Sequence, residues 1–217
     1  MYKTVVFDLD GTLLNTLTDL ADAGNRLCRK YGWPTHERQA YRYFVGNGIP
    51  KLVERLAPAD QRTPAVLEAA LADFKRDYGQ HLRDTTAPYP GIPEMLAKLK
   101  ANGVQLAVFS NKADVLAKEV VKDYFGTQYF TIVRGQMTGV APKPAAEGTN
   151  ALLQALHADP ASTLYVGDSN VDVETAHNAN LPCCGAVWGF RTREELNAAG
   201  AEYLAENSDE LYDVIMK

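Results

Sequence analysis

The sequence has few cysteines, no long apolar run and no excess of positive charge. Its three cysteines are an odd number, and two of them, Cys183 and Cys184, are adjacent, which favours reduced thiols over a disulfide framework. No stretch approaches the roughly 18 apolar residues of a membrane span, and the N-terminus leads into a strand pattern without a signal peptide. With 22 Lys and Arg against 27 Asp and Glu, neither a nucleic acid nor an anionic membrane is expected as a partner. These absences favour a cytoplasmic protein.

The histidines are also few and scattered. His36, His81, His157 and His177 show no spacing typical of metal ligands. The chain has no low-complexity segment and no long internal repeat. At 217 residues and 46% hydrophobic content, it is long and apolar enough for one large domain, or for a core domain with a smaller insertion.

The predicted elements alternate between strands and helices everywhere except in one region. The β-branched and aromatic segment 4–7 is typical of a buried parallel strand. Residues 15–86 contain only helical patterns, at 16–31, 37–44, 49–56 and 63–78. After the turn at 88–91, helices are predicted at 92–101, 114–125, 146–157 and 172–180, and strands at 104–109, 130–133, 163–166 and 185–188, before two terminal helical patterns. We therefore predict an α/β fold, with a doubly wound parallel sheet from residues 1–14 and 87–217 and an inserted α-helical domain from 15–86.

Polar side chains follow three of the predicted strands. Asp8 and Asp10 follow the first, Ser110 the second and Asp168 the fourth. Because the carboxyl ends of parallel strands lie along one edge of the sheet, these side chains are expected to converge. Carboxylates brought together there need a neutralising cation or a shared proton, and a hard cation with oxygen ligands, above all Mg²⁺, is the favoured solution.

These residues belong to four ordered motifs that resemble those of the haloacid dehalogenase (HAD) superfamily. The motifs are Asp8-Leu9-Asp10-Gly11-Thr12, Ser110-Asn111-Lys112, Lys143-Pro144 and Gly167-Asp168-Ser169-Asn170-Val171-Asp172. The resemblance spans the whole chain, and the helical insertion resembles the C1 cap of that superfamily. Among the subfamilies, the chain is most similar to the phosphoglycolate phosphatases, through Ser110-Asn111-Lys112, Gly46-Asn47-Gly48 and Tyr89-Pro90-Gly91.

The resemblance implies a Mg²⁺-dependent phosphatase that acts on a small phosphorylated metabolite, with 2-phosphoglycolate the best candidate. Asp8 would be the nucleophile that forms an aspartyl-phosphate. Asp10, held by a hydrogen bond from Thr12, would be the general acid and then the general base. The metal ligands would be the Asp8 carboxylate, the Asp10 backbone carbonyl and the Asp168 carboxylate.

Further residues would bind the substrate or support the site. The resemblance implies that Ser110, Asn111 and Lys143 bind the phosphoryl group and that Asp172 orients a metal-bound water or the Lys143 ammonium. Gly46, Asn47 and Gly48 would either contact the substrate or form a simple turn. Lys51 could form a Schiff base, as a cap lysine does in phosphonoacetaldehyde hydrolases, but a solvated charge is the favoured interpretation.

Two departures from the superfamily pattern and several alternative functions stay open. Asn15 stands where an acid is common, and Ala145-Ala146 follows Lys143-Pro144 where a second proline is common. The alternatives are a β-phosphoglucomutase-like phosphotransferase, a pyrophosphatase, and a non-enzymatic phosphate-binding regulatory relative. The second aspartate, Asp10, disfavours a dehalogenase, and the intact motifs disfavour the regulatory relative. Either a monomer or a homodimer is compatible with the sequence.

Overall fold

The computed structural model describes residues 1–217 and divides the chain into two compact units. The sheet unit contains Met1–Leu14 and Pro88–Lys217, and the helical unit contains Asn15–Ala87. The two segments in which the chain crosses between the units pair with each other as a two-stranded sheet, formed by β2 (Leu14–Asn15) and β3 (Ala87–Pro88). No helix combines the length and apolar character needed to span a membrane.

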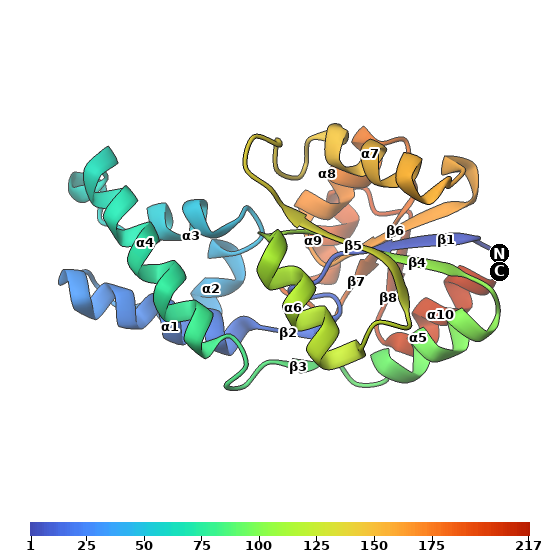
Figure 1. Ribbon diagram of the computed structural model, residues 1–217, viewed down its shortest axis with the longest axis horizontal. Helices are drawn as coiled ribbons and strands as arrows, with labels where there is room; N and C mark the ends of the chain where they lie inside the picture. Colours follow the sequence, from blue (N-terminus) through green and yellow to red (C-terminus); the bar gives the residue numbers. More distant parts are fainter. The chain divides into compact units, whose positions relative to one another are not determined.

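The sheet unit is built on a six-stranded parallel sheet with the order β5-β4-β1-β6-β7-β8 (Figure 1). The strands are β1 (Thr4–Phe7), β4 (Gln105–Ala113), β5 (Phe130–Gln136), β6 (Thr163–Gly167), β7 (Cys183–Ala186) and β8 (Tyr203–Ala205). β1 lies near the centre, between β4 and β6, and all four of its residues are buried. The predicted α/β fold with a parallel sheet is confirmed.

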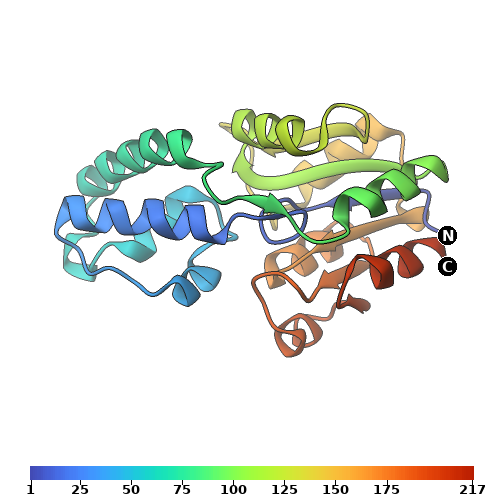
Figure 2. The same cartoon turned by 90° about the horizontal axis from the view of Figure 1, so that it is seen from below.

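Helices cover both faces of this sheet. They are α5 (Ile92–Ala101), α6 (Asp114–Phe125), α7 (Ala146–Leu156), α8 (Asn170–Asn178), α9 (Arg193–Ala198) and α10 (Ser208–Met216), with a 3₁₀ turn at Pro160–Ser162. Figure 1 shows α7 and α8 on one side of the sheet and α5 and α10 on the other. The two chain ends of this unit lie close together, since the Tyr2 N–H donates to the Ile215 carbonyl at 2.9 Å (Figure 2).

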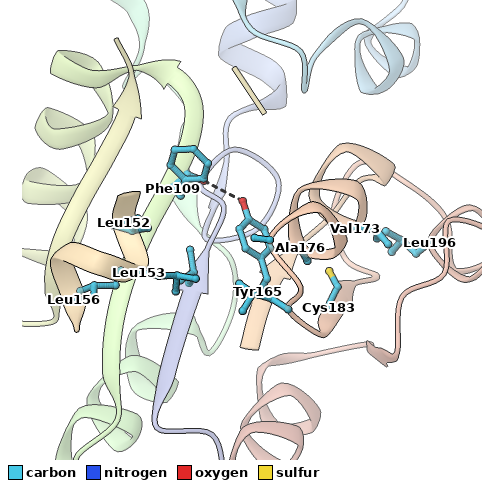
Figure 3. Close-up of a cluster of buried hydrophobic side chains, with 13 residues drawn as sticks. Phe109, Leu152, Leu153, Leu156, Tyr165, Val173, Ala176, Cys183 and Leu196 are labelled. Carbon is cyan, nitrogen blue, oxygen red and sulfur yellow. Dashed lines mark hydrogen bonds between the residues drawn. The ribbon is translucent and has the colours of Figure 1, made fainter. Parts of the chain in front are cut away.

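The hydrophobic core beneath α7, α8 and α9 includes one polar group, the hydroxyl of Tyr165. Leu152, Leu153 and Leu156 of α7 pack with Tyr165 of β6 and its neighbours in a buried cluster (Figure 3). The Tyr165 side chain is fully buried, and its O–H donates to the Phe109 carbonyl of β4 at 3.4 Å. A buried tyrosine normally needs such a partner for its hydroxyl. This hydroxyl also takes part in the candidate site described below.

The structure differs from the predicted elements at the ends of several of them and in three short strands. β5 runs to Gln136 instead of ending at residue 133, and β7 begins at Cys183 instead of residue 185. β4 extends to Ala113 instead of ending at residue 109, because a shift in its pairing with β5 between Phe109 and Ala113 keeps residues 110–112 extended without regular pairing. Ser110 therefore lies within the strand. The short strands β2 and β3 and the edge strand β8 were not predicted, because segments of two or three residues carry no measurable periodicity.

The helical unit consists of α1 (Leu17–Tyr31), α2 (Arg38–Phe44), α3 (Ile49–Leu56) and α4 (Pro64–His81), with a 3₁₀ turn at Ala59–Gln61. Its buried side chains include Leu20, Leu27, Leu52, Phe74 and Tyr78. The predicted start of α4 is confirmed, because the Thr63 hydroxyl accepts the Val66 N–H at 3.4 Å ahead of Pro64 in the first turn.

A buried carboxylate ties the first helix of this unit to its last residues. Asp19, in the first turn of α1, is 2% exposed. Its two oxygens accept hydrogen bonds from the backbone N–H and the hydroxyl of both Thr85 and Thr86, at 2.5–2.9 Å. Four donors satisfy a buried charge that would otherwise be costly.

Candidate functional site

A tight turn after β1 places two carboxylates at the centre of the sheet edge. Asp8 follows the last residue of β1, and its N–H donates to the Val166 carbonyl of β6 at 2.8 Å. Gly11 has φ +92°, and the Leu9 carbonyl accepts the N–H groups of residues 12, 13 and 14. The chain therefore reverses directly after Asp10. Asp8 and Asp10 stay at the carboxyl end of β1, as the sequence predicted.

Gly11 also leaves room for another carboxylate. A Cβ atom at this position would clash with Asp168 Oδ2. We expect Gly11→Ala to lower the free energy of unfolding by about 1–2 kcal/mol through its positive φ and by about 1–3 kcal/mol more through overpacking. Urea unfolding measures both, and Gly103→Ala is the matched control, because Gly103 has φ +78° with nothing within 4 Å. Equal losses in the two variants would contradict the close approach of residue 11 to Asp168.

Lys143 is a buried cation at this edge. Its side chain is 2% exposed, and its Nζ lies 2.8 Å from Asp8 Oδ1 and 2.7 Å from Asp172 Oδ1. Nζ also lies 3.2 Å from the Tyr165 hydroxyl and donates toward the Phe109 carbonyl at 3.4 Å. Burial by itself disfavours the charged ammonium, but the carboxylates of Asp172 and Asp8 raise the pKa of Lys143 well above its usual range. Lys143 therefore stays protonated and joins two separate segments of the chain.

Asp172 and Asp168 are both fixed by the chain around them. Asp172 Oδ2 accepts the N–H of Ser169 at 3.1 Å and its hydroxyl at 2.7 Å, in a capping box that begins α8. Asp168 Oδ2 accepts the Phe190 N–H at 2.7 Å, and Oδ1 accepts the Thr12 hydroxyl at 3.3 Å. Both acids are 1% exposed, so neither has the freedom of a surface side chain.

These acids carry more negative charge than the surrounding residues neutralise. Oxygen atoms of Asp8, Asp168 and Asp172 lie within 4.8 Å of one another, and Lys143 is the ammonium in contact with two of them. Burial raises the pKa of Asp8 to about 7, against the lowering effect of Lys143 and with an added rise from the charge of Asp172. Burial, together with the charges of Asp172 and Asp8, raises the pKa of Asp168 well above its usual range.

A divalent cation with a preference for oxygen ligands suits this cluster. Buried carboxylates that repel one another bind such a cation well, because its charge favours their ionised forms. Asp8 Oδ1 is buried and, apart from its ion pair with Lys143, accepts no hydrogen bond, and each oxygen of Asp168 accepts one. Asp172, in contrast, is engaged by the Lys143 ammonium and by two donors of Ser169. The chemistry of the cluster therefore fits a metal site of the kind that the sequence predicted.

The motif on β4 contributes three buried polar residues, Ser110, Asn111 and Lys112. The Ser110 hydroxyl accepts the Lys112 N–H at 3.2 Å. The Asn111 amide binds the backbone of Lys143, accepting its N–H at 2.8 Å and donating to its carbonyl at 3.2 Å. Asn111 thus fixes the segment that carries Lys143, which is a contact that its sequence position did not indicate.

Two side chains have partners other than those expected. Thr12, expected to hydrogen-bond to Asp10, instead donates to Asp168, because the Gly11 turn carries residue 12 across to that carboxylate. Asp10 is paired with Lys112, whose Nζ lies 3.1 Å from Oδ1 and 3.4 Å from Oδ2. Lys112 lies within a motif that the sequence analysis singled out, but it had no assigned role.

Eight of the predicted site residues come together within the sheet unit, through the contacts given above. They are Asp8, Asp10, Thr12, Ser110, Asn111, Lys143, Asp168 and Asp172.

Gly46, Asn47 and Gly48 belong to the helical unit, where they join α2 to α3. Arg55 fixes this loop by donating to the Phe44 carbonyl at 2.8 Å and to Asn47 Oδ1 at 2.9 Å. Lys51 pairs with Glu54 one turn away at 2.8 Å, as a solvated lysine does. The sequence did not identify Tyr165, because a tyrosine in an apolar strand is common without any function. Ser169 lies in the fourth motif, but the sequence assigned it no role.

The sequence of this chain is similar to one family of hydrolases and to phosphoglycolate phosphatases of several bacteria. The sequence profile of the family described as Haloacid dehalogenase-like hydrolase matches residues 5–186. The chain is 31% identical over 216 residues to the phosphoglycolate phosphatase of Chromobacterium violaceum, covering 98% of this chain and 96% of that protein. It is 32% identical over 191 residues to the phosphoglycolate phosphatase of Neisseria meningitidis serogroup A, covering 87% and 81% of the two chains.

A solved structure agrees with these similarities. A crystal structure from Lactobacillus delbrueckii subsp. bulgaricus, provisionally described as a phosphoglycolate phosphatase, superimposes with a TM-score of 0.93. The two chains are 28% identical, and the match covers 99% of this chain and 98% of that one.

Proposed function

Because the chain belongs to the haloacid dehalogenase-like hydrolases, we propose that it is a Mg²⁺-dependent phosphatase that hydrolyses the phosphate monoester of a small metabolite. The observation that carries this proposal is the convergence of Asp8, Lys143 and Asp168 from three separate segments at one edge of the sheet. The relatives named phosphoglycolate phosphatase support 2-phosphoglycolate as the leading substrate.

Two carboxylates divide the chemistry between them. A carboxylate oxygen of Asp8 attacks the phosphorus, and an aspartyl-phosphate forms as the bond from phosphorus to the leaving oxygen breaks. Asp10 gives its proton to that oxygen and later takes a proton from the water that attacks the aspartyl-phosphate. The second attack breaks the bond between Asp8 and phosphorus, so that inorganic phosphate leaves, Asp8 is again a carboxylate and Asp10 is again protonated.

Cationic and polar groups bind the phosphoryl oxygens. Lys143 is suited to this because its ammonium is already 2.8 Å from Asp8 Oδ1. The Ser110 hydroxyl, 3% exposed on β4, is a second donor. Asn111 and Asp172 act through Lys143, one by binding its backbone and the other by fixing its ammonium. Donors fixed before the substrate arrives need no reorganisation during phosphoryl transfer.

Mg²⁺ would be held by Asp8 and Asp168, together with the Asp10 backbone carbonyl, and would neutralise the charge that opposes the approach of a phosphate. Thr12 and the Phe190 N–H keep Asp168 oriented toward this position. Both of these contacts come from outside the segment that carries Asp168, so the orientation depends on the intact sheet unit.

The helical unit is proposed to be a C1 cap, with residues 15–86 as the cap domain and residues 1–14 and 87–217 as the core domain. Gly46, Asn47 and Gly48 would contact the part of the substrate beyond its phosphate. Since Arg55 occupies Asn47 Oδ1, Asn47 would offer its N–H₂ group to the substrate. A cytoplasmic location and a monomeric or homodimeric state stay predictions.

A panel of small phosphorylated compounds tests the proposal. Purified protein with Mg²⁺ is assayed for phosphate release from 2-phosphoglycolate, sugar phosphates, nucleoside monophosphates and pyrophosphate, and the substrates are ranked by kcat/KM. We expect 2-phosphoglycolate to rank first. Conversion of β-glucose 1-phosphate to glucose 6-phosphate at a higher rate than phosphate release would instead favour the mutase, and a preference for pyrophosphate would favour the pyrophosphatase. Absence of turnover on every compound would favour a binding protein.

A further inference from the structure

We infer that Lys112 is the positioning residue for Asp10, fixing its carboxylate in the orientation that proton transfer to the leaving group requires. The inference rests on the proposed function, because it assigns to Lys112 an effect on the general acid of that reaction. It predicts that the dependence of catalysis on Lys112 increases with the basicity of the leaving group.

The contacts between the two side chains are specific. The Lys112 Nζ lies 3.1 Å from Asp10 Oδ1 and 3.4 Å from Oδ2, so that the ammonium faces both oxygens of the carboxylate. The Lys112 side chain is 2% exposed, whereas that of Asp10 is 20% exposed. The Lys112 ammonium is thus buried, whereas the Asp10 carboxylate stays partly exposed to solvent. Such a contact fixes the orientation of Asp10 without covering the oxygen lone pairs that a substrate or water would meet.

The backbone around Lys112 explains why this lysine is buried. β4 and β1 are neighbouring strands of the sheet (Figure 1). The pairing of β4 with β5 shifts between Phe109 and Ala113, and within this irregular segment Ser110 Oγ accepts the Lys112 N–H at 3.2 Å. Burying an ammonium costs several kcal/mol unless an opposite charge is close by. The Asp10 carboxylate supplies that opposite charge for Lys112, so the two groups are coupled electrostatically.

The site uses its two buried lysines differently. Lys143 contacts Asp8 and Asp172, while Lys112 contacts Asp10. Asp8 and Asp10, the two acids with chemical roles in the proposed reaction, therefore contact different ammonium groups. Without Lys112, the carboxylate of Asp10, which is 20% exposed, would lose its ion pair and be free to turn toward solvent.

The proton balance identifies the step that is affected. In the first half-reaction the Asp8–phosphorus bond forms, the bond from phosphorus to the leaving oxygen breaks, and the proton of Asp10 passes to that oxygen. A nitrophenolate leaves readily without this proton, whereas an alkoxide does not. A misplaced Asp10 should therefore slow alkyl phosphates far more than aryl phosphates.

Lys112→Met removes the charge and keeps the length of the side chain. The measured quantity is kcat/KM, which reports the steps up to release of the leaving group, for 2-phosphoglycolate and for p-nitrophenyl phosphate. We expect a decrease of about 10- to 100-fold for the alkyl phosphate and less than about 3-fold for the aryl phosphate. Lys112→Gln, which keeps an N–H donor, should recover part of the loss. Lys118→Met is the matched control, because Lys118 is exposed on α6 and pairs only across one helical turn with Asp114.

A double-mutant comparison distinguishes positioning from a structural role. In an Asp10→Asn background, Lys112→Met should change neither substrate further, since the group through which it acts is gone. Equal losses on both substrates, or a full additional loss in the Asp10→Asn background, would overturn the inference while leaving the proposed phosphatase intact. Absence of turnover by the wild-type protein on both substrates would instead overturn the proposed function. If Lys112→Met does not fold, the same comparison is made with Lys112→Gln.

Discussion

Asp8→Asn is expected to abolish hydrolysis of p-nitrophenyl phosphate, by about 10³-fold or more, while the protein stays folded. An amide has no anionic oxygen with which to attack phosphorus, so the aspartyl-phosphate cannot form. The fold should survive because Lys143 keeps its contact with Asp172 at 2.7 Å. The substitution also removes one of three mutually repelling buried carboxylates, so the melting temperature should change little.

Release of nitrophenolate and thermal unfolding are measured on the same preparation. Asp213→Asn is the matched control, because it makes the same chemical change at an exposed position of α10. Acid quenching during turnover with ³²P-labelled substrate should trap a labelled protein in the wild type and none in Asp8→Asn. Turnover by Asp8→Asn within a few-fold of the wild type would exclude Asp8 as the nucleophile.

Removal of Mg²⁺ by a chelator is expected to lower turnover by about 100-fold or more, and re-addition of Mg²⁺ should restore it. Burial raises the pKa of Asp8 to about 7, which favours the neutral form of this carboxyl, and the neutral form cannot attack phosphorus. The excess negative charge of the cluster also repels a phosphate. A divalent cation bound by Asp8 and Asp168, as proposed above, would remove both obstacles.

Thermal unfolding tests the same cation without relying on activity. A ligand present at 100 times its Kd adds about 2.7 kcal/mol to the free energy of unfolding, so Mg²⁺ should raise the melting temperature of the wild type. Asp168→Asn should lose this increase, while its amide can still accept the Phe190 N–H and donate to the Thr12 hydroxyl. Undiminished turnover in chelator, or an equal Mg²⁺-dependent increase in Asp168→Asn, would contradict the metal site.

One rule of parallel sheets was enough to predict from the sequence both the sheet and the convergence of the polar residues at its edge. Apolar segments that end in Asp8, Ser110 or Asp168 must bring these residues to one edge if the strands run parallel. The rule works because burial on both faces of a strand gives a continuous apolar run. It fails for β8 (Tyr203–Ala205), a three-residue edge strand whose first residue is exposed. Pairing with β7, and not local sequence, stabilises that strand.

The partners of individual polar side chains were harder to predict. Thr12 meets Asp168 and Lys112 meets Asp10, although the sequence places Thr12 much closer to Asp10. These partnerships depend on the reversal at Gly11 and on the pairing shift in β4. Such backbone irregularities have little signature in a single sequence, whereas the motif that contains them is clear.

The Asp19 carboxylate has a consequence for how this chain can be rearranged. Because it holds Thr85 and Thr86 beside the beginning of α1, the seventy-odd residues from Asn15 to Ala87 start and finish at neighbouring points. These residues therefore form a single insertion between β1 and β4, with adjacent ends and a hydrophobic core of its own. A segment of this kind can be lengthened, exchanged or excised without disturbing the order of the parallel strands. If this unit is the proposed cap, substrate choice can therefore change there without altering the residues at the edge of the sheet.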